Sequence, residues 1–396
     1  MLKRKILLLS DAPTTSSGLG KICRELALRI NKMPEFEVAT LGTGMLVSKH
    51  LPFQQYLCGP LDGMAPINLR EVWHDFAGEE YGILLAIWNP GWLSWLTNPD
   101  LLPDGQMKHW LKYQDPFEKW GYFPVDAEGP NGRLPWDFAT IIKGFDRILS
   151  YTKWQADITE RTLARAPFNR PGETAHLPHG VDTSIFYPRN RKLARQQFLF
   201  MVTKQIDKPI DEKRFLIGCV ATNTPRKNWA LVFEVCQELL RRGMDVGLWA
   251  HTDVLKKNWN LEALAAEYGM QGRVIPTDTK LSDEDMAWAL SACDVCIAPG
   301  LGEGFGYPIF ESLACGVPCI HGDYGGAAEF LPAEYKVTPK SFYDDGFFDC
   351  KRPTFDILEW ADRVIAVNGQ QAKLPDELRW ANVWPRWEDW LREGLK

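Results

Sequence analysis

Residues 302–318, GEGFGYPIFESLACGVP, combine a glycine-rich turn with the start and the end of a helix. Gly304 and Gly306 allow the backbone to come close to a ligand, because glycine carries no side chain. Pro308 suits the first turn of a helix, and Gly316 suits its end. The free backbone N–H groups at such a helix start face an anion such as a diphosphate. This stretch therefore predicts an anion site built from a loop and a helix N-terminus.

Two glutamates stand eight positions apart in the same stretch, Glu303 in the loop and Glu311 in the first turns of the helix. Carboxylates accept hydrogen bonds from sugar and ribose hydroxyls. Taken alone, Glu311 would complement the helix dipole and Glu303 would be a solvated loop residue. Together with an anion site, the pair instead indicates a site for a sugar nucleotide.

The E-x7-E spacing, followed by a small-residue helix and a GVP turn, resembles the donor-site signature of retaining GT-B glycosyltransferases of the glycogen-synthase and mannosyltransferase type (family 4-like). The segment LPHGVDTSIFYP, residues 177–188, is similar to the hinge strand and turn of the same family. The resemblance implies transfer of a glycosyl group, expected to be a hexose, from a UDP- or GDP-sugar to a hydroxyl, with retention of anomeric configuration. It also implies that no metal ion or other cofactor is required.

Strand-like runs alternate with helical patterns along the chain, which predicts an α/β fold of parallel sheets flanked by helices. The runs form two series, which indicates two Rossmann-like domains, and the GT-B resemblance implies that these domains face a central cleft. We expect an N-terminal acceptor domain at residues 1–186 and a C-terminal donor domain at residues 187–377. By the same resemblance, a C-terminal helix at 378–396 crosses back onto the first domain.

The C-terminal segment carries four tryptophans at spacings of four, three and three, which stripe one face of a helix. Core packing between the domains explains this stripe better than a sugar platform. Pro385 argues against a single unbroken helix here. The four residues are Trp380, Trp384, Trp387 and Trp390.

The composition fits two globular domains, since 396 residues exceed one compact core and 45% of them are hydrophobic. The net charge of -6 gives no general attraction to polyanions, although a local basic groove would not show in that sum. The first apolar run ends at Ser10 and Asp11, too early for a signal peptide, and predicts a buried strand. No apolar run of 18 residues occurs, so we expect a cytoplasmic protein without a stable membrane anchor.

Nine cysteines include a C-x2-C pair, Cys293 and Cys296, and a C-x3-C pair, Cys315 and Cys319, loosely like the ligands of a zinc ribbon. The first pair begins the strand-like run DVCIAP, where residues three apart point to opposite faces. The second pair brackets the GVP turn. We therefore expect reduced, buried thiols and no zinc site.

The segment CVATNTPRKNW, residues 219–229, follows the first strand of the second domain. Arg226 and Lys227 would clamp a diphosphate and neutralise the charge that grows on the leaving nucleotide, unless they are a solvated surface pair. The family resemblance places an arginine five residues before this lysine, but Thr222 stands there in this chain and Arg226 is adjacent to the lysine instead. Asn223 in the same loop is also assigned to the donor.

Further segments resemble the ligand loops of the family. One loop follows the first strand, at the carboxyl end where open α/β sheets bind ligands. Another precedes a helix whose acidic first turn, Asp283 and Asp285 after Ser282, predicts a capping box rather than a metal site. The glycine-rich turn would grip the sugar, and Glu311 the ribose. The predicted donor-binding residues are Gly18, Leu19, Gly20, Asn223, Arg226, Lys227, His251, Lys280, Leu281, Glu303, Gly304, Phe305, Gly306, Tyr307 and Glu311.

The acceptor side rests on the segment KWGYFPVDAEG, residues 119–129, which resembles a family strand that ends in a catalytic or sugar-contacting His or Asp. Asp126 would orient the donor sugar or the acceptor hydroxyl; as a turn former it would have neither role. The residues assigned to catalysis are Glu303, Asp126, Arg226 and Lys227. Those assigned to the acceptor are Trp88, Asn89, Trp92, Tyr122 and Asp126.

Several functions stay open from the sequence. A glycan or small molecule is the first choice of acceptor. The second is a 5-hydroxymethylpyrimidine base in phage-type DNA, stacked on first-domain aromatics, with phosphates held by a basic stretch that is otherwise a solvated linker. A sugar-nucleotide epimerase would need acid and base residues that the chain does not clearly supply, and a non-catalytic sugar-nucleotide-binding protein is the remaining class. The aromatics are Trp88, Trp92, Trp95, Trp110, Tyr122 and Trp136, and the basic residues are Arg189, Arg191, Lys192 and Arg195.

Overall fold

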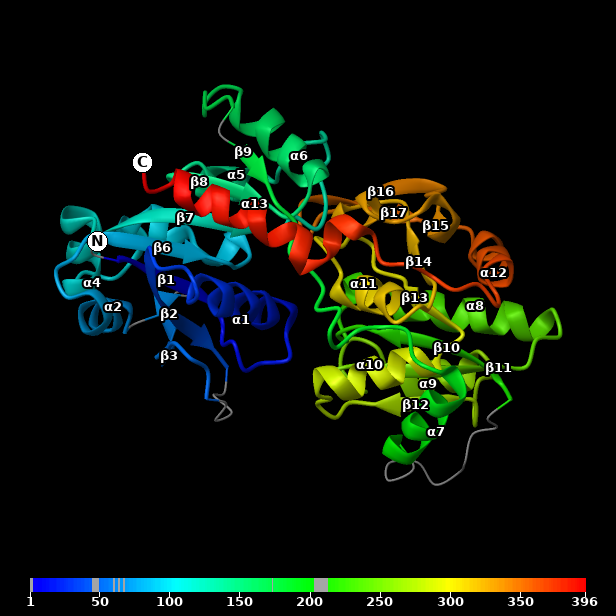
Figure 1. The fold of residues 1–396 in the computed structure, drawn as a ribbon. Helices are drawn as coiled ribbons and strands as arrows, with labels where there is room; N and C mark the ends of the chain where they lie inside the picture. Colours follow the sequence, from blue (N-terminus) through cyan, green and yellow to red (C-terminus); the bar gives the residue numbers. More distant parts are fainter. Residues whose placement is uncertain are drawn as a thin grey trace. The chain divides into compact units, whose positions relative to one another are not determined.

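The computed structural model describes residues 3–44, 50–59, 61–62, 65–66, 68–172, 174–202 and 213–396. The chain divides into two compact units, Met1–Leu177 and Pro178–Lys396 (Figure 1). The division therefore lies earlier than the expected boundary at residue 186. The C-terminal segment from residue 378 belongs to the second unit, and its crossing onto the first domain stays a prediction.

The first unit is built on a seven-stranded sheet with the strand order β3-β2-β1-β6-β7-β8-β9, in which neighbouring strands pair in parallel. Two short strands, β4 (Leu61–Asp62) and β5 (Ala65–Pro66), form a separate antiparallel pair. The strands are β1 (Arg4–Asp11), β2 (Phe36–Thr43), β3 (Gln54–Leu57), β6 (Gly82–Ala86), β7 (Phe117–Phe123), β8 (Arg147–Ser150) and β9 (Thr174–His176). The α-helices are α1 (Gly18–Ile30), α2 (Leu69–Ala77), α3 (Ser94–Thr97), α4 (Gln106–His109), α5 (Trp136–Ile142) and α6 (Lys153–Leu163).

The second unit is built on a six-stranded parallel sheet with the order β12-β11-β10-β13-β14-β15, and a separate antiparallel hairpin. The strands are β10 (Phe215–Val220), β11 (Val246–His251), β12 (Val274–Thr277), β13 (Val295–Ala298), β14 (Cys319–Gly322) and β15 (Lys336–Val337), with β16 (Ser341–Asp345) and β17 (Cys350–Thr354) in the hairpin. The helices are α7 (Arg191–Val202), α8 (Trp229–Arg241), α9 (Leu261–Glu267), α10 (Asp283–Ala292), α11 (Tyr307–Ala314), α12 (Ile357–Ala366) and α13 (Trp380–Glu393).

In each main sheet the first strand, β1 or β10, lies inside the sheet, and later strands are added on both sides of it. In the second unit, β10 has β11 on one side and β13 on the other, so the chain winds outward both ways from this pair. A crevice opens at the carboxyl ends of the strands at such a switch point, and open α/β sheets bind their ligands there. The loops that leave β10 and β13 are thereby placed side by side. These two loops hold seven of the fifteen predicted donor-binding residues, including Arg226, Lys227 and Glu303.

The α/β class and the two Rossmann-like units predicted from the sequence are confirmed. The central residues of β1 and β10 are buried, because in a parallel sheet helices cover both faces. The sequence did not predict four short elements, which are β3, the β4–β5 pair, β15 and the β16–β17 hairpin. They lie at sheet edges or outside the main sheets, where strands carry a weaker apolar pattern.

Helix α13 runs without interruption through Pro385, so the expectation of a broken helix is wrong. Proline removes one backbone donor, and burial of the tryptophan face offsets that loss. Trp380, Trp387 and Trp390 are buried, and the Trp387 indole N–H donates to the Pro178 carbonyl at 3.0 Å. Three of the four tryptophans therefore pack within the second unit, and the predicted packing between the domains stays a prediction.

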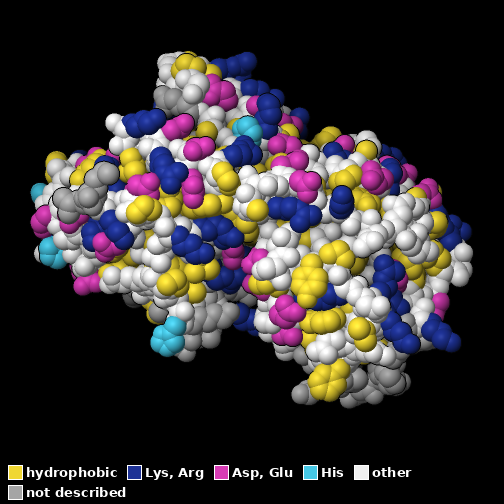
Figure 2. Space-filling view, viewed as in Figure 1, with side chains coloured by type: hydrophobic (Ala, Val, Ile, Leu, Met, Phe, Trp, Pro, Cys, Tyr) yellow, Lys and Arg dark blue, Asp and Glu magenta, His cyan; other side chains and the backbone are white. Residues whose placement is uncertain are grey.

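All nine cysteines are free, and all except Cys58 are buried, as expected for packed thiols. Among the residues that the structure describes, no helix is both long enough and apolar enough to span a membrane. On the face shown in Figure 2, basic and acidic side chains are interspersed over both units.

Candidate functional site

The loop at residues 299–306 carries the chain from β13 into α11 and has the backbone that the sequence predicts. Gly306 caps the helix in the left-handed region at φ 80°, and Pro308 lies in the first turn. Gly316 ends the helix at φ 81°, where a residue with a side chain would be strained. A side chain at Gly300 would place its Cβ 2.4 Å from Oε1 of Glu303. Glycine at position 300 therefore makes room for that carboxylate.

Two basic side chains of the loop that follows β10 form ion pairs with Glu303. Its Oε1 lies 2.5 Å from Nζ of Lys227, and its Oε2 lies 3.3 Å from Nη1 of Arg226. The Arg226 guanidinium also donates to the Gly302 carbonyl, while the Leu301 N–H donates to the Arg226 carbonyl at 2.8 Å. The two loops at the switch point are thus joined by side chains and by backbone. The structure brings together three of the four residues that the sequence assigned to catalysis.

The charge of Glu303 is set by its environment. Burial by itself would raise the pKa of this carboxyl, but Lys227 and Arg226 together outweigh burial and hold the pKa at about 2. Glu303 is only 8% exposed, so its attraction to the two cations is weakly screened by solvent. The carboxylate is therefore ionised. It forms ion pairs with Arg226 and Lys227, the two side chains that the sequence assigned to a diphosphate.

Asn223 serves the loop rather than a ligand. Its side-chain amide donates to the carbonyls of Val254 and Trp259 at 2.7 and 2.8 Å, and its side-chain oxygen accepts the Trp259 N–H at 2.8 Å. Its backbone N–H donates to Asp253 at 2.6 Å. Because these groups are used within the chain, the predicted contact of the Asn223 side chain with the donor does not fit this structure. Its hydrogen bonds instead fix the loop that presents Arg226 and Lys227.

The remaining residues of the glycine-rich turn pack inward. Phe305 and Tyr307 are 3% and 7% exposed, and their rings lie 3.8 and 4.8 Å from the ring of His179. His179 belongs to the hinge-like segment, and burial lowers its pKa well below the usual value. The family-like hinge sequence therefore supports the back of the glycine-rich turn.

Glu311 and His251 are each placed on a different element of the second unit. Glu311 lies within α11, as predicted, and is 4% exposed. His251 ends β11, where its Nδ1 lies 2.8 Å from Oγ1 of Thr277, and burial lowers its pKa to about 4. An imidazole with that pKa is neutral near pH 7 and can hydrogen-bond but does not attract a phosphate. Their contacts with a donor stay predictions.

The segment before α10 is exposed at Lys280, as a loop that holds a base through its backbone would be. The Ser282 hydroxyl accepts the Asp285 N–H at 3.0 Å and thereby caps the helix, so the predicted capping arrangement is confirmed. In the described ranges, no group of three or more His, Cys, Asp or Glu side chains is arranged to hold a metal ion.

The glycine loop of the first unit is organised by Asp11, which ends β1. Asp11 accepts hydrogen bonds from the hydroxyls of Ser17 at 2.5 Å and Thr43 at 3.0 Å, and from the Trp88 indole at 3.3 Å. Ser17 in turn caps α1 by accepting the Gly20 N–H at 3.0 Å. This chain of bonds orients the first turn of α1, which carries Gly18, Leu19 and Gly20.

Burial rules out two of the five residues that the sequence assigned to the acceptor. Trp88 and Tyr122 are 1% and 0% exposed, so they offer no face to a sugar or a base. Trp95 and Trp110 are also buried in the hydrophobic core of the first unit. These aromatics fill the core because large apolar rings gain most from leaving water.

Four other candidate residues of the first unit are at least partly exposed. Trp92 and Trp136 are 41% and 58% exposed and do offer aromatic surface. Asn89 turns its side-chain oxygen to the Gly91 N–H at 2.9 Å, so that oxygen is engaged in a turn. Asp126 follows β7 and is partly exposed, as a carboxylate that contacts a substrate must be.

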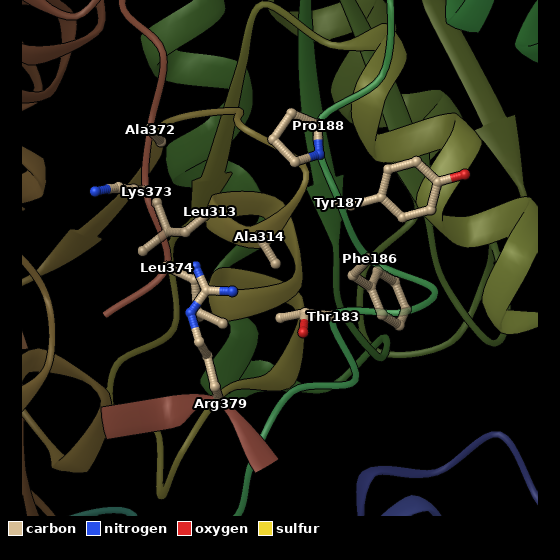
Figure 3. A pocket seen from close by; sticks show the side chains of 10 residues that line it. All are labelled: Thr183, Phe186, Tyr187, Pro188, Leu313, Ala314, Ala372, Lys373, Leu374 and Arg379. Atoms are coloured by element: carbon tan, nitrogen blue, oxygen red, sulfur yellow. The ribbon is translucent and has the colours of Figure 1, made fainter. Parts of the chain in front are cut away.

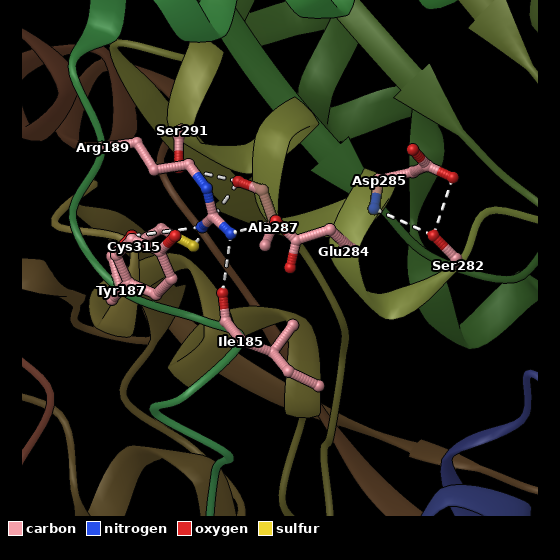
Figure 4. Close-up of polar contacts among 9 residues, drawn as sticks. All are labelled: Ile185, Tyr187, Arg189, Ser282, Glu284, Asp285, Ala287, Ser291 and Cys315. Atoms are coloured by element: carbon pink, nitrogen blue, oxygen red, sulfur yellow. Dashed lines mark hydrogen bonds and ion pairs between the residues drawn. The ribbon is translucent and has the colours of Figure 1, made fainter.

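Three arginines of the basic stretch after the hinge form ion pairs within the second unit, so the stretch is not a wholly solvated linker. The Arg189 side chain is 2% exposed and donates to the carbonyl of Ile185 at 2.9 Å and to Glu284 at 2.8 Å (Figure 4). Its guanidinium lies 4.1 and 4.8 Å from the rings of Tyr187 and Trp288. Arginine thus locks the linker onto α10 through both charge and stacking.

Two further arginines of this stretch bind one carboxylate. Arg191 lies 3.0 Å from Oδ1 of Asp294, and Arg195 pairs with Oδ2 of the same residue. Arg195 also donates to the carbonyls of Ala292 and Arg214 at 3.0 Å. These pairs attach α7 to the sheet, so only Lys192 of the four basic residues stays exposed. The sequence interpretation failed because charge alone does not show where its partner lies.

A separate pocket of about 150 Å³ lies at the C-terminal end of α11 (Figure 3). The ion pair of Glu303 precedes the start of the same helix, so the pocket and the ion pair are different places. The pocket is lined by Thr183, Phe186, Tyr187, Pro188, Leu313, Ala314, Ala372, Lys373, Leu374 and Arg379.

The loops that hold Arg226, Lys227 and Glu303 fall inside a region with known relatives. Residues 202–338 match the family of glycosyl transferases group 1. We call this matched stretch the group 1 domain. The group 1 domain contains β10 to β14 and therefore the whole Glu303 ion pair.

The chain is similar to known mannosyltransferases over part of its length. It is 30% identical over 213 residues to MMP alpha-(1->4)-mannosyltransferase of Mycolicibacterium hassiacum, which covers 53% of this chain and 42% of that protein. It is 29% identical over 176 residues to the GDP-mannose-dependent alpha-(1-6)-phosphatidylinositol monomannoside mannosyltransferase of Mycolicibacterium smegmatis, with 43% of each chain covered. The matched region therefore spans less than half the length of these relatives.

Solved structures share the fold of the whole chain. Sucrose-phosphate synthase (tll1590) from Thermosynechococcus elongatus superposes with a TM-score of 0.68 at 16% identity, covering 99% of both chains. Anabaena Alr3699/HepE, solved in complex with UDP and glucose, gives a TM-score of 0.70 at 13% identity, covering 98% of this chain and 100% of the other. The group 1 domain is thus the second half of a GT-B fold.

Proposed function

We propose that the protein is a glycosyltransferase that transfers a sugar from a nucleotide-diphosphate sugar to a hydroxyl group. The observation that carries this proposal is the convergence of Arg226, Lys227 and Glu303 at the sheet's switch point, inside the group 1 domain. Two cations suit a diphosphate, and the carboxylate beside them suits the hydroxyls of the attached sugar. One sequence relative is GDP-mannose-dependent by name, and one structural relative was solved in complex with UDP and glucose, which supports the same donor class.

In the proposed mechanism the donor takes over the cations that Glu303 holds. The diphosphate would bind Arg226, Lys227 and the free N–H groups at the start of α11, whose cap is Gly306. Glu303, released from part of its ion pairing, would accept hydrogen bonds from the sugar. As the bond to the sugar breaks, the same cations stabilise the growing charge on the leaving diphosphate. Glu311 would hold the ribose.

We further propose that transfer proceeds with retention, as the family resemblance implies. It would need no metal ion, because two cationic side chains supply the charge stabilisation that a metal supplies elsewhere. The donor base would be uracil or guanine. One structural relative was solved in complex with UDP, and one sequence relative is GDP-mannose-dependent by name. The acceptor would be a hydroxyl of a glycan or a small molecule. Asp126 and Trp92 are the exposed candidates for contacting it.

The test is incubation of the full chain with a panel of UDP- and GDP-sugars and glycan, small-molecule or hydroxymethylated-DNA acceptors, with and without EDTA. Nucleotide release and acceptor mass are followed together. We expect EDTA-resistant release with a sugar added to a non-DNA acceptor. A sugar on DNA would overturn our choice of acceptor, and an altered donor sugar without release would indicate an epimerase.

The matched variants are Lys227→Met and Lys256→Met. Lys256 also forms an ion pair in the second unit, with Glu262 at 2.6 Å, but both partners are well exposed. We expect Lys227→Met to lower kcat/KM by about 100-fold or more, the scale of one lost transition-state contact. Lys256→Met should leave it unchanged. Tight nucleotide binding with no turnover under any condition would mean that the protein only binds sugar nucleotides.

A further inference from the structure

His321 lies on the strand next to the origin of the glycine-rich loop. It belongs to β14, where its partner across the sheet is Ala298, the last residue of β13. Its side chain is 0% exposed, and its Nδ1 lies 2.7 Å from the Ala298 carbonyl oxygen. A carbonyl only accepts, so Nδ1 carries the proton and Nε2 of the neutral ring presents a lone pair.

That lone pair has no hydrogen-bond partner among the residues that the structure describes. A buried acceptor without a donor costs about 1–3 kcal/mol, and such an atom in a native protein points to a partner that is not in place. Two charged side chains act electrostatically on the ring, Glu303 and Lys227. A carboxylate accepts only, whereas the ammonium of lysine carries three donors. Lys227 is therefore the charged neighbour able to satisfy Nε2.

We propose that His321 is a positioning residue of the donor site, whose Nε2 accepts a hydrogen bond from Lys227 when a nucleotide-diphosphate sugar draws Glu303 away. The inference rests on the proposed function. In the present structure Lys227 Nζ is directed to Glu303 at 2.5 Å. Once the carboxylate turns to the sugar, one N–H of the ammonium goes to His321 and the others remain for the diphosphate.

The charge balance around the ring supports this role. Burial lowers the pKa of His321 most, and Lys227 lowers it further, while the carbonyls of Ala298 and Tyr324 and the carboxylate of Glu303 act in the opposite direction. The net effect is a lowered pKa, so the ring is neutral near pH 7. It therefore remains an acceptor and adds no positive charge beside Lys227. Sequence reasoning had treated His321 as a packing or loop residue.

Two substitutions separate the two nitrogens of the ring. In His321→Asn the amide nitrogen takes the place of Nδ1 and keeps the bond to the Ala298 carbonyl, but nothing remains at Nε2. In His321→Gln the longer amide places an oxygen where Nε2 lies, but the donor to Ala298 is lost. Each variant therefore keeps one function of the histidine and removes the other.

The measurement is calorimetric titration of the full chain with UDP, GDP, UDP-glucose and GDP-mannose. We expect His321→Asn to weaken binding of the sugar nucleotide by about tenfold, or about 1.4 kcal/mol, and His321→Gln by less than about threefold. The opposite order would show that the histidine acts only through Ala298 and would overturn the proposal. Ser291→Ala, which removes a buried bond of 2.7 Å to the Ala287 carbonyl in the same unit, should bind as the wild type does.

Lys227→Met separates this inference from the proposed function. If Lys227→Met binds sugar nucleotides as tightly as the wild type, the donor site itself is misplaced. If Lys227→Met loses binding and His321→Asn does not, only the role of His321 fails. The double variant gives a third check that does not depend on stability. Because His321 acts through Lys227, adding His321→Asn to Lys227→Met should cause no further loss of affinity.

Discussion

Replacing Glu303 by glutamine should destabilise the protein in the absence of ligand and increase the stabilisation that nucleotide provides. The change keeps the shape of the side chain but removes its charge from between Lys227 and Arg226. The pKa of Glu303 falls from an ordinary 4.5 to about 2. At about 1.4 kcal/mol for each pKa unit, the ionised carboxylate contributes about 3 kcal/mol to folding. Removing one partner of a buried pair costs a similar amount, about 3–5 kcal/mol.

The assay is thermal unfolding of wild type and Glu303→Gln, each with and without UDP or GDP. A loss of about 3 kcal/mol corresponds to about 6–12 °C for a unit of this size. Because the diphosphate no longer competes with Glu303 for the two cations, nucleotide should raise the Tm of the variant by more than it raises that of the wild type. Transfer itself should be lost in the variant, as it should be in Glu303→Ala.

The pH dependence has a definite sign. The pKa of Glu303 is depressed in the folded state to about 2, so its contribution is complete above about pH 5 and is lost as the pH falls from about 4.5 towards 2. The difference in Tm between wild type and Glu303→Gln should therefore shrink across that window. Equal stability of the two proteins at pH 7, or a difference that grows in acid, would refute the ion-pair argument.

Five other substitutions test the placement of side chains by the fold. Arg189→Ala should cost about 2–3 kcal/mol in urea unfolding, because a buried guanidinium loses charged hydrogen bonds, whereas Arg241→Ala on the surface should change stability by less than about 0.5 kcal/mol. Gly20→Ala puts a Cβ 2.6 Å from the Ala12 carbonyl oxygen and should cost about 1–3 kcal/mol, measured by the same method; a neutral result would mean that the loop moves freely. Trp88→Ala should lower stability by about 3–5 kcal/mol, while Trp92→Ala should leave stability intact and raise the acceptor KM, and equal Tm losses would contradict this division.

The glycine-rich turn and helix start at residues 302–318 could be predicted from the sequence, because they depend on the backbone preferences of single residues. Gly306 and Gly316 adopt positive φ angles and Pro308 enters the first turn of α11, as their chemistry requires. The main strands were predictable for a similar reason, since a strand buried on both faces is a continuous apolar run. Glu303 could be singled out because its spacing from Glu311 is a property of the sequence alone.

The partners of individual side chains could not be predicted in this way. Trp88 and Trp92 are four residues apart and chemically identical, yet one is buried and the other is 41% exposed. Arg189 carries the same charge as Lys192, yet only the lysine stays exposed. In both cases the decisive contact comes from another element of the fold, and nothing in the local sequence encodes it.

The sequence by itself determined the α/β class, the two sheets and the loop-to-helix turn at residues 302–318, because backbone preference and apolar periodicity are properties of short segments. Tertiary structure decided that Glu303 lies against Lys227 and Arg226, and that His321 stands buried beside them with one nitrogen unpaired. These contacts join strands that are distant along the chain but adjacent in the sheet. Their strength depends on burial, which lowers the screening of charge and raises the cost of an unmade hydrogen bond, and burial exists only once the sheet has formed.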